Sequence, residues 1–398
     1  MENPKITVII PTRERAVVLE NALRTVTSQD YKNLEIIVSD NYSMDGTDKV
    51  VEQAKDSRIR YLNTGKRLSM SHNWEFALSH VQDGWVTFIG DDDGLLPRAI
   101  SRIAEIIQQT KAQIIRTEYC TYDWPSIAGR PHGQLIVPLT LGYELRNSKQ
   151  WLYKVLNGHS HYNQLPMIYN GGFIHISLLQ KMKERVGCFF ASVNPDVYTA
   201  LALARLVDEF LYVREPLAIS GTSKYSNGYS AFSTNTLHGK SAYQHFLSEG
   251  NIPFHLEVPT LEDGSIPLSL QACVYEAYLQ AAPLGNGIMT ITHEQQLPIL
   301  LATSGKHRDS VDEWGKLFAE YHGLNFTQAL KSANRLRPFL QARIFGRKLT
   351  RVASSVVTDR LHLQNVYDAS VAAGVIRIMP SRNDSVSFLF KELVAKSN

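Results

Sequence analysis

The 398-residue sequence has few of the features that mark secreted, membrane-spanning or zinc-binding proteins. Its three cysteines, Cys120, Cys188 and Cys273, lie far apart and have no neighbouring Cys or His at zinc-ligand spacing, which predicts reduced thiols rather than disulfides or a zinc cluster. No segment reaches the roughly 18 apolar residues that cross a bilayer, and the apolar run at residues 6–10 is too short for a signal peptide. We therefore expect a cytoplasmic protein.

The sequence also lacks a strong excess of either charge, because 41 basic and 38 acidic side chains leave a formal net charge of +3. A balance this close to neutral argues against a nucleic-acid partner. The charge is unevenly distributed, however. Residues 331–398 hold 12 basic and four acidic side chains and so carry a net +8, which leaves −5 for residues 1–330. An acidic body therefore precedes a basic C-terminal region.

Three common motifs are missing as well. No G-x-G-x-x-G follows the first apolar run, so a dinucleotide fingerprint is absent, and no G-x-x-x-x-G-K-[ST] phosphate-binding loop occurs. The G-x-S-x-G turn that carries the nucleophile of α/β-hydrolases is also missing. Any nucleotide must therefore be bound by other groups.

What the first third of the sequence does have is a regular alternation of short apolar runs and amphipathic segments. The runs at 6–10, 34–39, 59–62, 85–89 and 113–117 predict strands, and the segments at 16–28, 47–56, 71–82 and 96–109 predict helices. This alternation is typical of a mostly parallel sheet with helices on both faces. Ligands of such sheets bind beyond the carboxyl ends of the strands.

The remaining sequence divides into an irregular and a helical part. Residues 118–190 are rich in aromatic residues, glycine and proline, which is typical of binding loops. Asn194 and Pro195 then begin a helix, and a loop follows at 220–236. Further helices are predicted at 267–282, 293–303, 309–321, 325–336, 339–355 and 385–396. We expect a catalytic domain over 1–235, with halves 1–117 and 118–235, and a mainly helical region over 236–398.

Polar groups follow three of the predicted strands. The first strand is followed by Pro11-Thr12-Arg13, the second by Ser39-Asp40-Asn41 and the fourth by Gly90-Asp91-Asp92-Asp93-Gly94. Neighbouring carboxylates repel one another where water is scarce, and a divalent cation bound together with substrate phosphates would relieve the repulsion. The alternative is a solvated acidic turn that caps the helix beginning near residue 96.

Four segments together resemble family 2 glycosyltransferases of the GT-A fold. They are Val8–Thr12, Ile37–Thr47, Met70–Trp74 and Gly90–Pro97, and the resemblance covers roughly residues 5–225. It implies an α/β fold of the GT-A type, a Rossmann-like sandwich, followed here by the helical C-terminal region. It also implies an inverting, metal-dependent transfer of a sugar from a nucleotide-diphosphate sugar to a hydroxyl of a glycan acceptor. Such a reaction fits the synthesis of a bacterial surface polysaccharide.

The resemblance further implies which residues bind the donor and the metal. Asp40 would accept the imide N–H of a pyrimidine base, which favours a UDP- or dTDP-linked sugar. Asp93, Asp91 and, from the C-terminal side, His238 would bind Mn²⁺ or Mg²⁺, which would neutralise the departing diphosphate. The full predicted donor site comprises Pro11, Thr12, Arg13, Asp40, Asn41, Ser43, Lys66, Asn73, Asp91 and Asp92.

For the acceptor side, the resemblance implies a catalytic base at the start of a later helix, and Asp196 fits this position. The helix N-terminus would favour its ionised form. The alternative is that Asp196 is only a first-turn helix acid. His159, His161 and Tyr162 are predicted to line the acceptor pocket, because aromatic and polar side chains suit sugar faces and hydroxyls.

The basic segment 331–351 contains seven Lys or Arg residues and no acidic residue. An amphipathic basic helix is typical of binding to an anionic membrane surface, which would suit a polyprenyl-diphosphate-linked acceptor at the inner leaflet. The alternatives are a solvated helix or one packed on the catalytic domain. Two other functions stay open for the whole chain: a sugar-1-phosphate nucleotidyltransferase and an inactive glycan-binding relative.

Overall fold

The computed structural model describes residues 3–128, 132–226, 236–237, 240–241, 248–285, 291–358 and 360–378. The predicted metal ligand His238 and the predicted helix at 385–396 lie outside these ranges. Among the described residues, no helix has both the length and the apolar composition needed to cross a bilayer.

The described strands form one 11-stranded sheet and a separate two-stranded hairpin. In the N-terminal half of the large sheet four neighbouring strands run parallel in the order β4-β1-β2-β3. Their bounds are β1 Ile6–Thr12, β2 Leu34–Asp40, β3 Ile59–Asn63 and β4 Trp85–Phe88. All four follow the predicted apolar runs closely, which confirms the alternating pattern of the first third.

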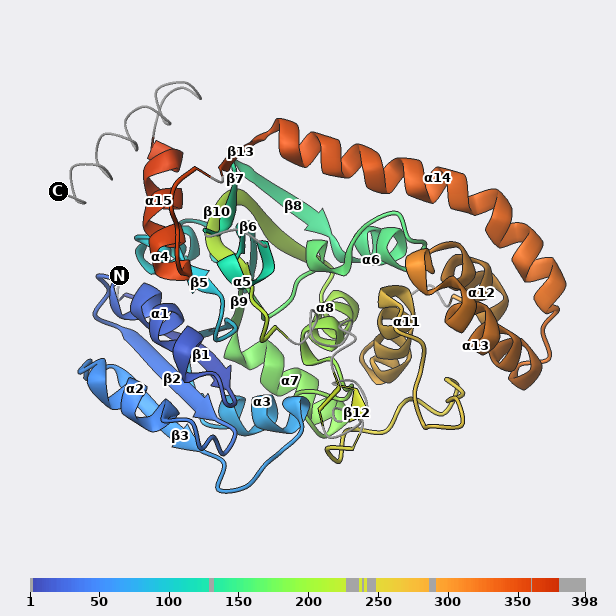
Figure 1. The fold of residues 1–398 in the computed structure, drawn as a ribbon, viewed down its shortest axis with the longest axis horizontal. Helices are drawn as coiled ribbons and strands as arrows, with labels where there is room; N and C mark the ends of the chain where they lie inside the picture. Colours follow the sequence, from blue (N-terminus) through green and yellow to red (C-terminus); the bar gives the residue numbers. More distant parts are fainter. Residues whose placement is uncertain are drawn as a thin grey trace.

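The other half of the sheet is largely antiparallel (Figure 1). β9 lies between β4 and β6 and is antiparallel to both, whereas β10 is parallel to β6. The α/β class is therefore confirmed with a mixed sheet. The strands of this half are β5 Gly94–Leu95, β6 Ile114–Asp123, β7 Gln134–Pro138, β8 Tyr143–Asn147, β9 Gly172–His175, β10 Glu209–Thr222 and β13 Ser355–Thr358, and the hairpin is formed by β11 Thr236–Leu237 and β12 Lys240–Ser241.

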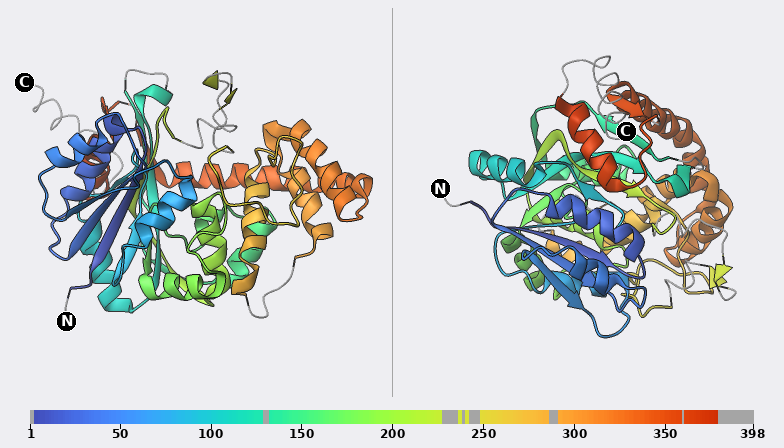
Figure 2. Two further views of the ribbon diagram at one scale, coloured as in Figure 1. Left: turned by 90° about the horizontal axis from the view of Figure 1, so that it is seen from below. Right: turned by 60° about the vertical axis from the view of Figure 1, so that its left-hand side comes forward.

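Helices cover both faces of the sheet because its central strands bury side chains on both sides. Ile6, Val8 and Ile10 of β1 join one core cluster with α1 and α4, while Ile9 joins another with α3 and α8. Figure 2 shows the sheet edge-on with helices on both of its sides. The helices of this region are α1 Ala16–Thr27, α2 Thr47–Gln53, α3 Met70–Leu78, α4 Ala99–Thr110, α5 Pro125–Ala128, α6 Ser148–Leu156, α7 Ile176–Val186 and α8 Pro195–Leu206.

Beyond residue 250 the chain is mainly helical, as predicted. The segments predicted as two helices at 325–336 and 339–355 form one helix, α14, with Pro338 inside it. Figure 1 shows α14 running from the side of α12 and α13 to the edge of the sheet. The helices are α11 Leu270–Gln280, α12 His293–Ala302, α13 Arg308–Tyr321, α14 Phe326–Ala353 and α15 Val366–Ile378, with short 3₁₀ turns at Tyr162–Gln164, Ala282–Leu284 and Gly305–His307.

The chain after α14 returns to the sheet. β13 pairs with β7, and α15 packs beside α1, where the Arg24 guanidinium lies 4.0 Å from the ring centre of Tyr367. Residues 355–378 thus add a strand and a covering helix to the sheet. The boundary near residue 235 remains a prediction.

Candidate active site

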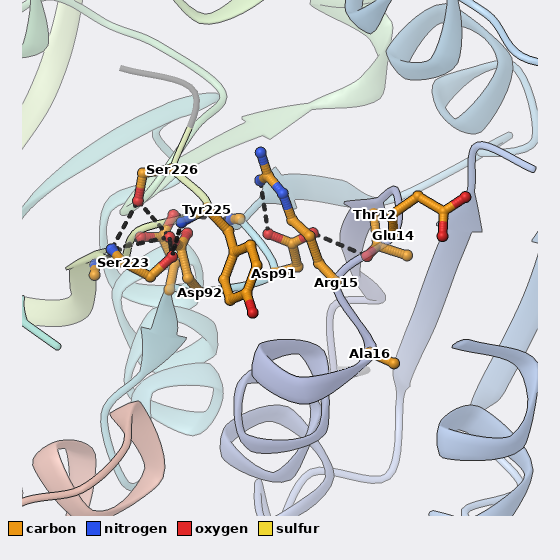
Figure 3. Close-up of polar contacts among 12 residues, drawn as sticks. Thr12, Glu14, Arg15, Ala16, Asp91, Asp92, Ser223, Tyr225 and Ser226 are labelled. Carbon is orange, nitrogen blue, oxygen red and sulfur yellow. Dashed lines mark hydrogen bonds and ion pairs between the residues drawn. The ribbon is translucent and has the colours of Figure 1, made fainter. Parts of the chain in front are cut away.

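The strand ends meet at one edge of the parallel half, as the pattern predicts. Thr12 is the register partner of Asp40 across β1 and β2, and β4 lies on the other side of β1. The Thr12 hydroxyl donates a hydrogen bond of 2.8 Å to Asp91 in the loop after β4. This loop, which holds Asp91, Asp92 and Asp93, is called the aspartate loop. Figure 3 shows this contact between the end of β1 and the aspartate loop. Residues from three different strand ends therefore form one site.

Asp91 is buried and held from two sides. One carboxylate oxygen accepts the hydrogen bond from Thr12, and the other lies 3.1 Å from the guanidinium of Arg15 (Figure 3). Burial raises the pKa of the Asp91 carboxyl despite the neighbouring Arg15 charge. Arg15 was not among the predicted site residues. It stands at the start of α1, only three residues after Thr12, and this proximity was the available signal.

Asp92 points away from Asp91 and holds the end of β10. Its carboxylate accepts bonds from the hydroxyls of Ser223, at 2.7 Å, and Ser226, at 2.5 Å (Figure 3). A Cβ at Gly221 would lie 1.8 Å from the Asp92 carbonyl oxygen, so only glycine fits there. Asp92 therefore has a positioning role in this structure, whereas the sequence predicted donor contact.

Asp93, the third aspartate of the loop, contacts both Tyr169 and the end of β10. The Tyr169 hydroxyl donates to one Asp93 oxygen at 2.5 Å, and the Gly221 amide donates to the other at 2.7 Å. Burial, with a smaller contribution from the Asp92 charge, raises the pKa of Asp93 to about 7. Tyr169 is itself packed against Trp74, with ring centres 5.5 Å apart. Sequence reasoning missed Tyr169.

Asp40 is almost completely buried, with 1% of its surface exposed. It accepts hydrogen bonds from the Tyr61 hydroxyl at 2.6 Å, the Asn63 amide at 3.0 Å and the Ser43 backbone at 3.0 Å. An ionised carboxylate offers about four acceptor positions, so these three donors leave room for one more. One acceptor position of Asp40 therefore remains for the predicted hydrogen bond with the base of the nucleotide.

Several other predicted donor residues support the rim of the site instead of standing free. The Asn41 side chain bonds both the carbonyl and the amide of Leu68, at 2.7 and 2.8 Å, and so ties down the loop before α3. The buried Asn73 amide oxygen accepts a bond of 2.8 Å from the Ser39 hydroxyl. These two residues hold the β2 end in place.

The remaining members of the predicted donor site are more exposed, pair with other side chains or bond the backbone. Arg13 forms an ion pair of 2.6 Å with Glu249, and the Ser43 hydroxyl accepts a bond from the Glu14 amide at 2.8 Å. Lys66 is exposed in the loop after β3, and Pro11 is the next-to-last residue of β1. Their predicted donor contacts remain predictions.

Asp196 stands in the first turn of α8, where the sequence predicts it, and accepts a 2.7 Å hydrogen bond from Tyr162. The two residues are therefore brought together as expected for one pocket. Burial raises the pKa of the Asp196 carboxyl, although the Tyr162 hydroxyl lowers it. The backbone amide of Val197 at the helix start lowers the pKa of Asp196, as the sequence predicts, but burial has the larger effect.

The segment that carries both tyrosines is fixed by a buried arginine. The Arg116 guanidinium donates to the carbonyl oxygens of Asn163, Tyr169 and Asn170 at 2.7–3.0 Å. Arg116 is only 1% exposed and lies on β6. Sequence reasoning missed it, since nothing in its local sequence distinguishes it from a surface arginine.

The predicted acceptor histidines lie next to Tyr162 in the segment after α6. His161 packs beside the Tyr162 ring, with ring centres 4.6 Å apart, and its Nδ1 accepts a bond from the Asn163 amide at 3.3 Å. His159 is partly buried two residues earlier. Both therefore lie in the segment that carries Tyr162, the hydrogen-bond partner of Asp196.

The aspartate loop can bind a divalent cation when a bound substrate supplies further oxygen ligands. Within the described ranges, no three His, Cys, Asp or Glu side chains converge as a ready-made metal site. Asp91 and Asp93 nevertheless present buried carboxylates whose raised pKa a cation would lower, and Asp93 keeps acceptor capacity on the oxygen that contacts only Gly221. One or two carboxylates plus phosphate oxygens is a set that Mg²⁺ prefers.

Comparison with known proteins gives a consistent picture for the N-terminal region. Residues 7–165 match the sequence model described as Glycosyl transferase family 2. A Campylobacter jejuni protein named GalNAc(5)-diNAcBac-PP-undecaprenol beta-1,3-glucosyltransferase is 40% identical over 114 residues, covering 28% of this chain and 37% of that protein. Putative glycosyltransferase EpsE of Bacillus subtilis is 29% identical over 132 residues, covering 32% and 47%. The chain thus spans less than half the length of these relatives.

Among solved structures, the crystal structure of S. aureus TarS in complex with UDP-GlcNAc is similar to this chain with a TM-score of 0.47 and 14% sequence identity. The similarity covers 84% of this chain and 92% of that one.

Proposed function

We propose that this chain is a member of glycosyl transferase family 2, whose model matches residues 7–165, and that it transfers a sugar from a nucleotide-diphosphate sugar to a hydroxyl of a glycan acceptor. One observation carries the assignment of the two substrates. Tyr169 donates a hydrogen bond to Asp93, and burial followed by the charges of Asp93, Asp92 and Asp196 raises the pKa of its hydroxyl. Tyr169 therefore lies near a carboxylate suited to the donor and near a carboxylate suited to the acceptor.

The donor would bind along the edge formed by Thr12, Asp40 and Asp91. The remaining acceptor position of Asp40 suits the imide N–H of uracil or thymine, which favours a UDP- or dTDP-linked sugar. Arg15, which pairs with Asp91, adds positive charge beside the site of the phosphates. This fixes the register of the nucleotide relative to the aspartate loop.

We propose that Asp93, with Asp91, binds Mn²⁺ or Mg²⁺ together with the donor diphosphate. A bound cation supplies positive charge that stabilises the departing nucleoside diphosphate. The protein residues hold the loop for this purpose: Tyr169 and Gly221 fix the orientation of Asp93 through the bonds described above. His238 stays a predicted ligand outside the described residues.

Asp196 is proposed as the base that removes the proton from the acceptor hydroxyl as this hydroxyl attacks the anomeric carbon, which gives inversion. Its raised pKa makes it a stronger base than an exposed aspartate. The Tyr162 hydroxyl, at 2.7 Å, orients the carboxylate. His159 and His161 flank this point and are proposed to contact the acceptor.

For the acceptor we propose a polyprenyl-diphosphate-linked glycan of a bacterial surface polysaccharide. The name of the C. jejuni relative refers to a PP-undecaprenol-linked substrate. This supports the class of lipid-linked acceptors but does not identify the sugar. An enzyme with such an acceptor works at the inner face of the membrane. α14 offers a surface for that contact.

We expect α14 to bind anionic membranes through its exposed apolar side chains. Phe345 and Leu349 are 63% and 54% exposed on the same side of the helix, and Lys348 lies beside them. Replacing both by serine should weaken co-sedimentation with phosphatidylglycerol vesicles about tenfold or more, because partial burial of two large side chains contributes about 2 kcal/mol. The matched control is Leu256→Ser, which removes an 87% exposed leucine elsewhere. Equal vesicle binding by all three proteins would reject the α14 contact.

The proposed reaction is tested by incubating the protein with a panel of nucleotide sugars and Mn²⁺ or Mg²⁺. We expect slow release of free nucleoside diphosphate from one donor, with water replacing the acceptor. Release of pyrophosphate from a sugar-1-phosphate and a nucleoside triphosphate would instead identify a nucleotidyltransferase. Glycan binding with no turnover of any donor would identify an inactive relative.

A further inference from the structure

Two arginines of α14, Arg347 and Arg351, are on the side of the helix that faces the catalytic body. Ala333 and Leu340, which are buried, mark that side. Arg347 and Arg351 follow Leu340 at helical spacing, so they share its face, and both are partly buried. The outer side of the helix is the apolar one described above. The sequence left open whether this basic face meets a membrane, the solvent or the catalytic domain, and in the structure these two arginines share the packed face of Leu340.

The inward cations lie over the segment that carries the acceptor residues. The Arg351 guanidinium donates a 3.2 Å hydrogen bond to the Tyr119 carbonyl and lies 5.1 Å from the centre of its ring. Burial and the charges of Arg343 and Arg347 lower the pKa of His159. Three cations of one helix thus approach Tyr119 and the loop after α6.

These cations have no acidic partner in the part of the chain that the structure describes. No ion pair joins Arg343, Arg347 or Arg351 to a described carboxylate, and the buried Nε of Arg351 has no hydrogen-bond partner. Glu118, which adjoins Tyr119, accepts its bond from the Tyr212 hydroxyl instead. Grouping the partly buried Arg347 and Arg351 with the exposed Arg343 without a counter-charge is unfavourable. An external anion would remove this cost.

The cluster is connected to the proposed catalytic base by direct contacts. The Asn163 side chain bonds the Tyr119 hydroxyl, and the neighbouring Tyr162 hydroxyl bonds Asp196. Tyr119, Asn163 and Tyr162 therefore connect Arg351 to Asp196. This is a suitable place for a charged group attached to the acceptor.

We propose that Arg343, Arg347 and Arg351 form a binding site for a phosphate or diphosphate group, and that this group belongs to the lipid-linked acceptor. The assignment to an acceptor rests on the proposed transferase function, whereas the anion site rests on the cation cluster alone. Arginine guanidinium groups suit phosphate oxygens because they can donate two parallel hydrogen bonds. A free phosphate compound could offer the same chemistry, so the test separates the two sources.

The test is calorimetric titration of the full chain with farnesyl diphosphate, farnesol and inorganic pyrophosphate, in EDTA to exclude cation-dependent binding at the aspartate loop. We expect farnesyl diphosphate to bind and farnesol to bind much more weakly. Arg347→Gln and Arg351→Gln should each weaken farnesyl diphosphate binding about tenfold or more, since each removes charged hydrogen bonds. Lys331→Gln, an exposed cation on the same helix, should leave the affinity unchanged.

Each other outcome overturns a defined part of the proposal. Equal affinity of the arginine variants and the unchanged protein would place the anion elsewhere and reject the site. Binding of pyrophosphate but not of farnesyl diphosphate would reject the lipid-linked source. Circular dichroism of each variant checks folding. The nucleotide-sugar hydrolysis test is independent of these titrations, so its failure would reject the transferase function while the anion site could still be demonstrated.

Discussion

Replacing Asp196 by asparagine should reduce the rate of sugar transfer by about 100- to 10,000-fold, which is the usual contribution of a general base. The amide keeps the size of the side chain but cannot accept the proton of the acceptor hydroxyl. Donor binding should be unchanged, because Asp196 stands in the first turn of α8, whereas the proposed donor contacts lie at the ends of β1, β2 and β4. Transfer rates and calorimetric titration with the nucleoside diphosphate measure the two effects.

The control for this variant is Asp208→Asn, which changes a carboxylate that is 89% exposed just beyond the end of the same helix. It should retain full activity. If Asp196→Asn kept more than a tenth of the original rate, Asp196 would be a first-turn helix acid and the base would have to be sought elsewhere.

The acid limb of the pH profile gives an independent check on the same residue. Burial raises the pKa of Asp196, so the active carboxylate is lost as pH falls through this raised value, earlier than for an exposed aspartate. The Tyr162 hydroxyl stabilises the carboxylate. Tyr162→Phe should therefore raise the pKa further and move the acid limb to higher pH, while Asp196→Asn should abolish this limb.

Replacing Asp93 by asparagine should abolish cation-dependent turnover of the donor. The variant loses the negative charge that we propose binds the cation beside the diphosphate, and with it most of the transition-state stabilisation at the leaving group. Thermal denaturation gives a readout that does not depend on activity. Mn²⁺ and the nucleoside diphosphate together should raise the melting temperature of the unchanged protein by several degrees and leave that of Asp93→Asn nearly unchanged.

The matched control is Asp309→Asn at the exposed start of α13, which should behave like the unchanged protein. A variant at Asp93 that still showed the full Mn²⁺-dependent stabilisation would reject this residue as a metal ligand. Unchanged melting of the original protein with any cation and nucleoside diphosphate would reject the metal proposal as a whole.

The sequence predicts the parallel half of the fold and the residues at its strand ends because both follow from local patterns. The apolar runs specify β1, β2 and β4, and parallel register then requires Thr12, Asp40 and the aspartate loop to lie at one edge. The same logic places Asp196 at the start of α8, since Asn194 and Pro195 are helix-start signals.

Residues that depend on long-range pairing could not be predicted. β9 is only four residues long and lies in the irregular segment, so its position between β4 and β6 is invisible in the sequence. Tyr169 and the chain around it are placed by this strand and by Arg116. The hydrogen bonds of Asp92 to Ser223 and of Asn73 to Ser39 could not be predicted either, because these partners are far away in the sequence.

The return of residues 355–378 to the sheet has a consequence for the order of folding during synthesis. Val18 and Ala22 of α1 share a core cluster with Val366, Ala369 and Ala373 of α15. The second helix layer over the first strand–helix unit is therefore completed by chain that the ribosome produces more than 300 residues later. Until then this apolar face of α1 stays exposed, and we expect a nascent chain ending at α14 to need a chaperone to remain unaggregated.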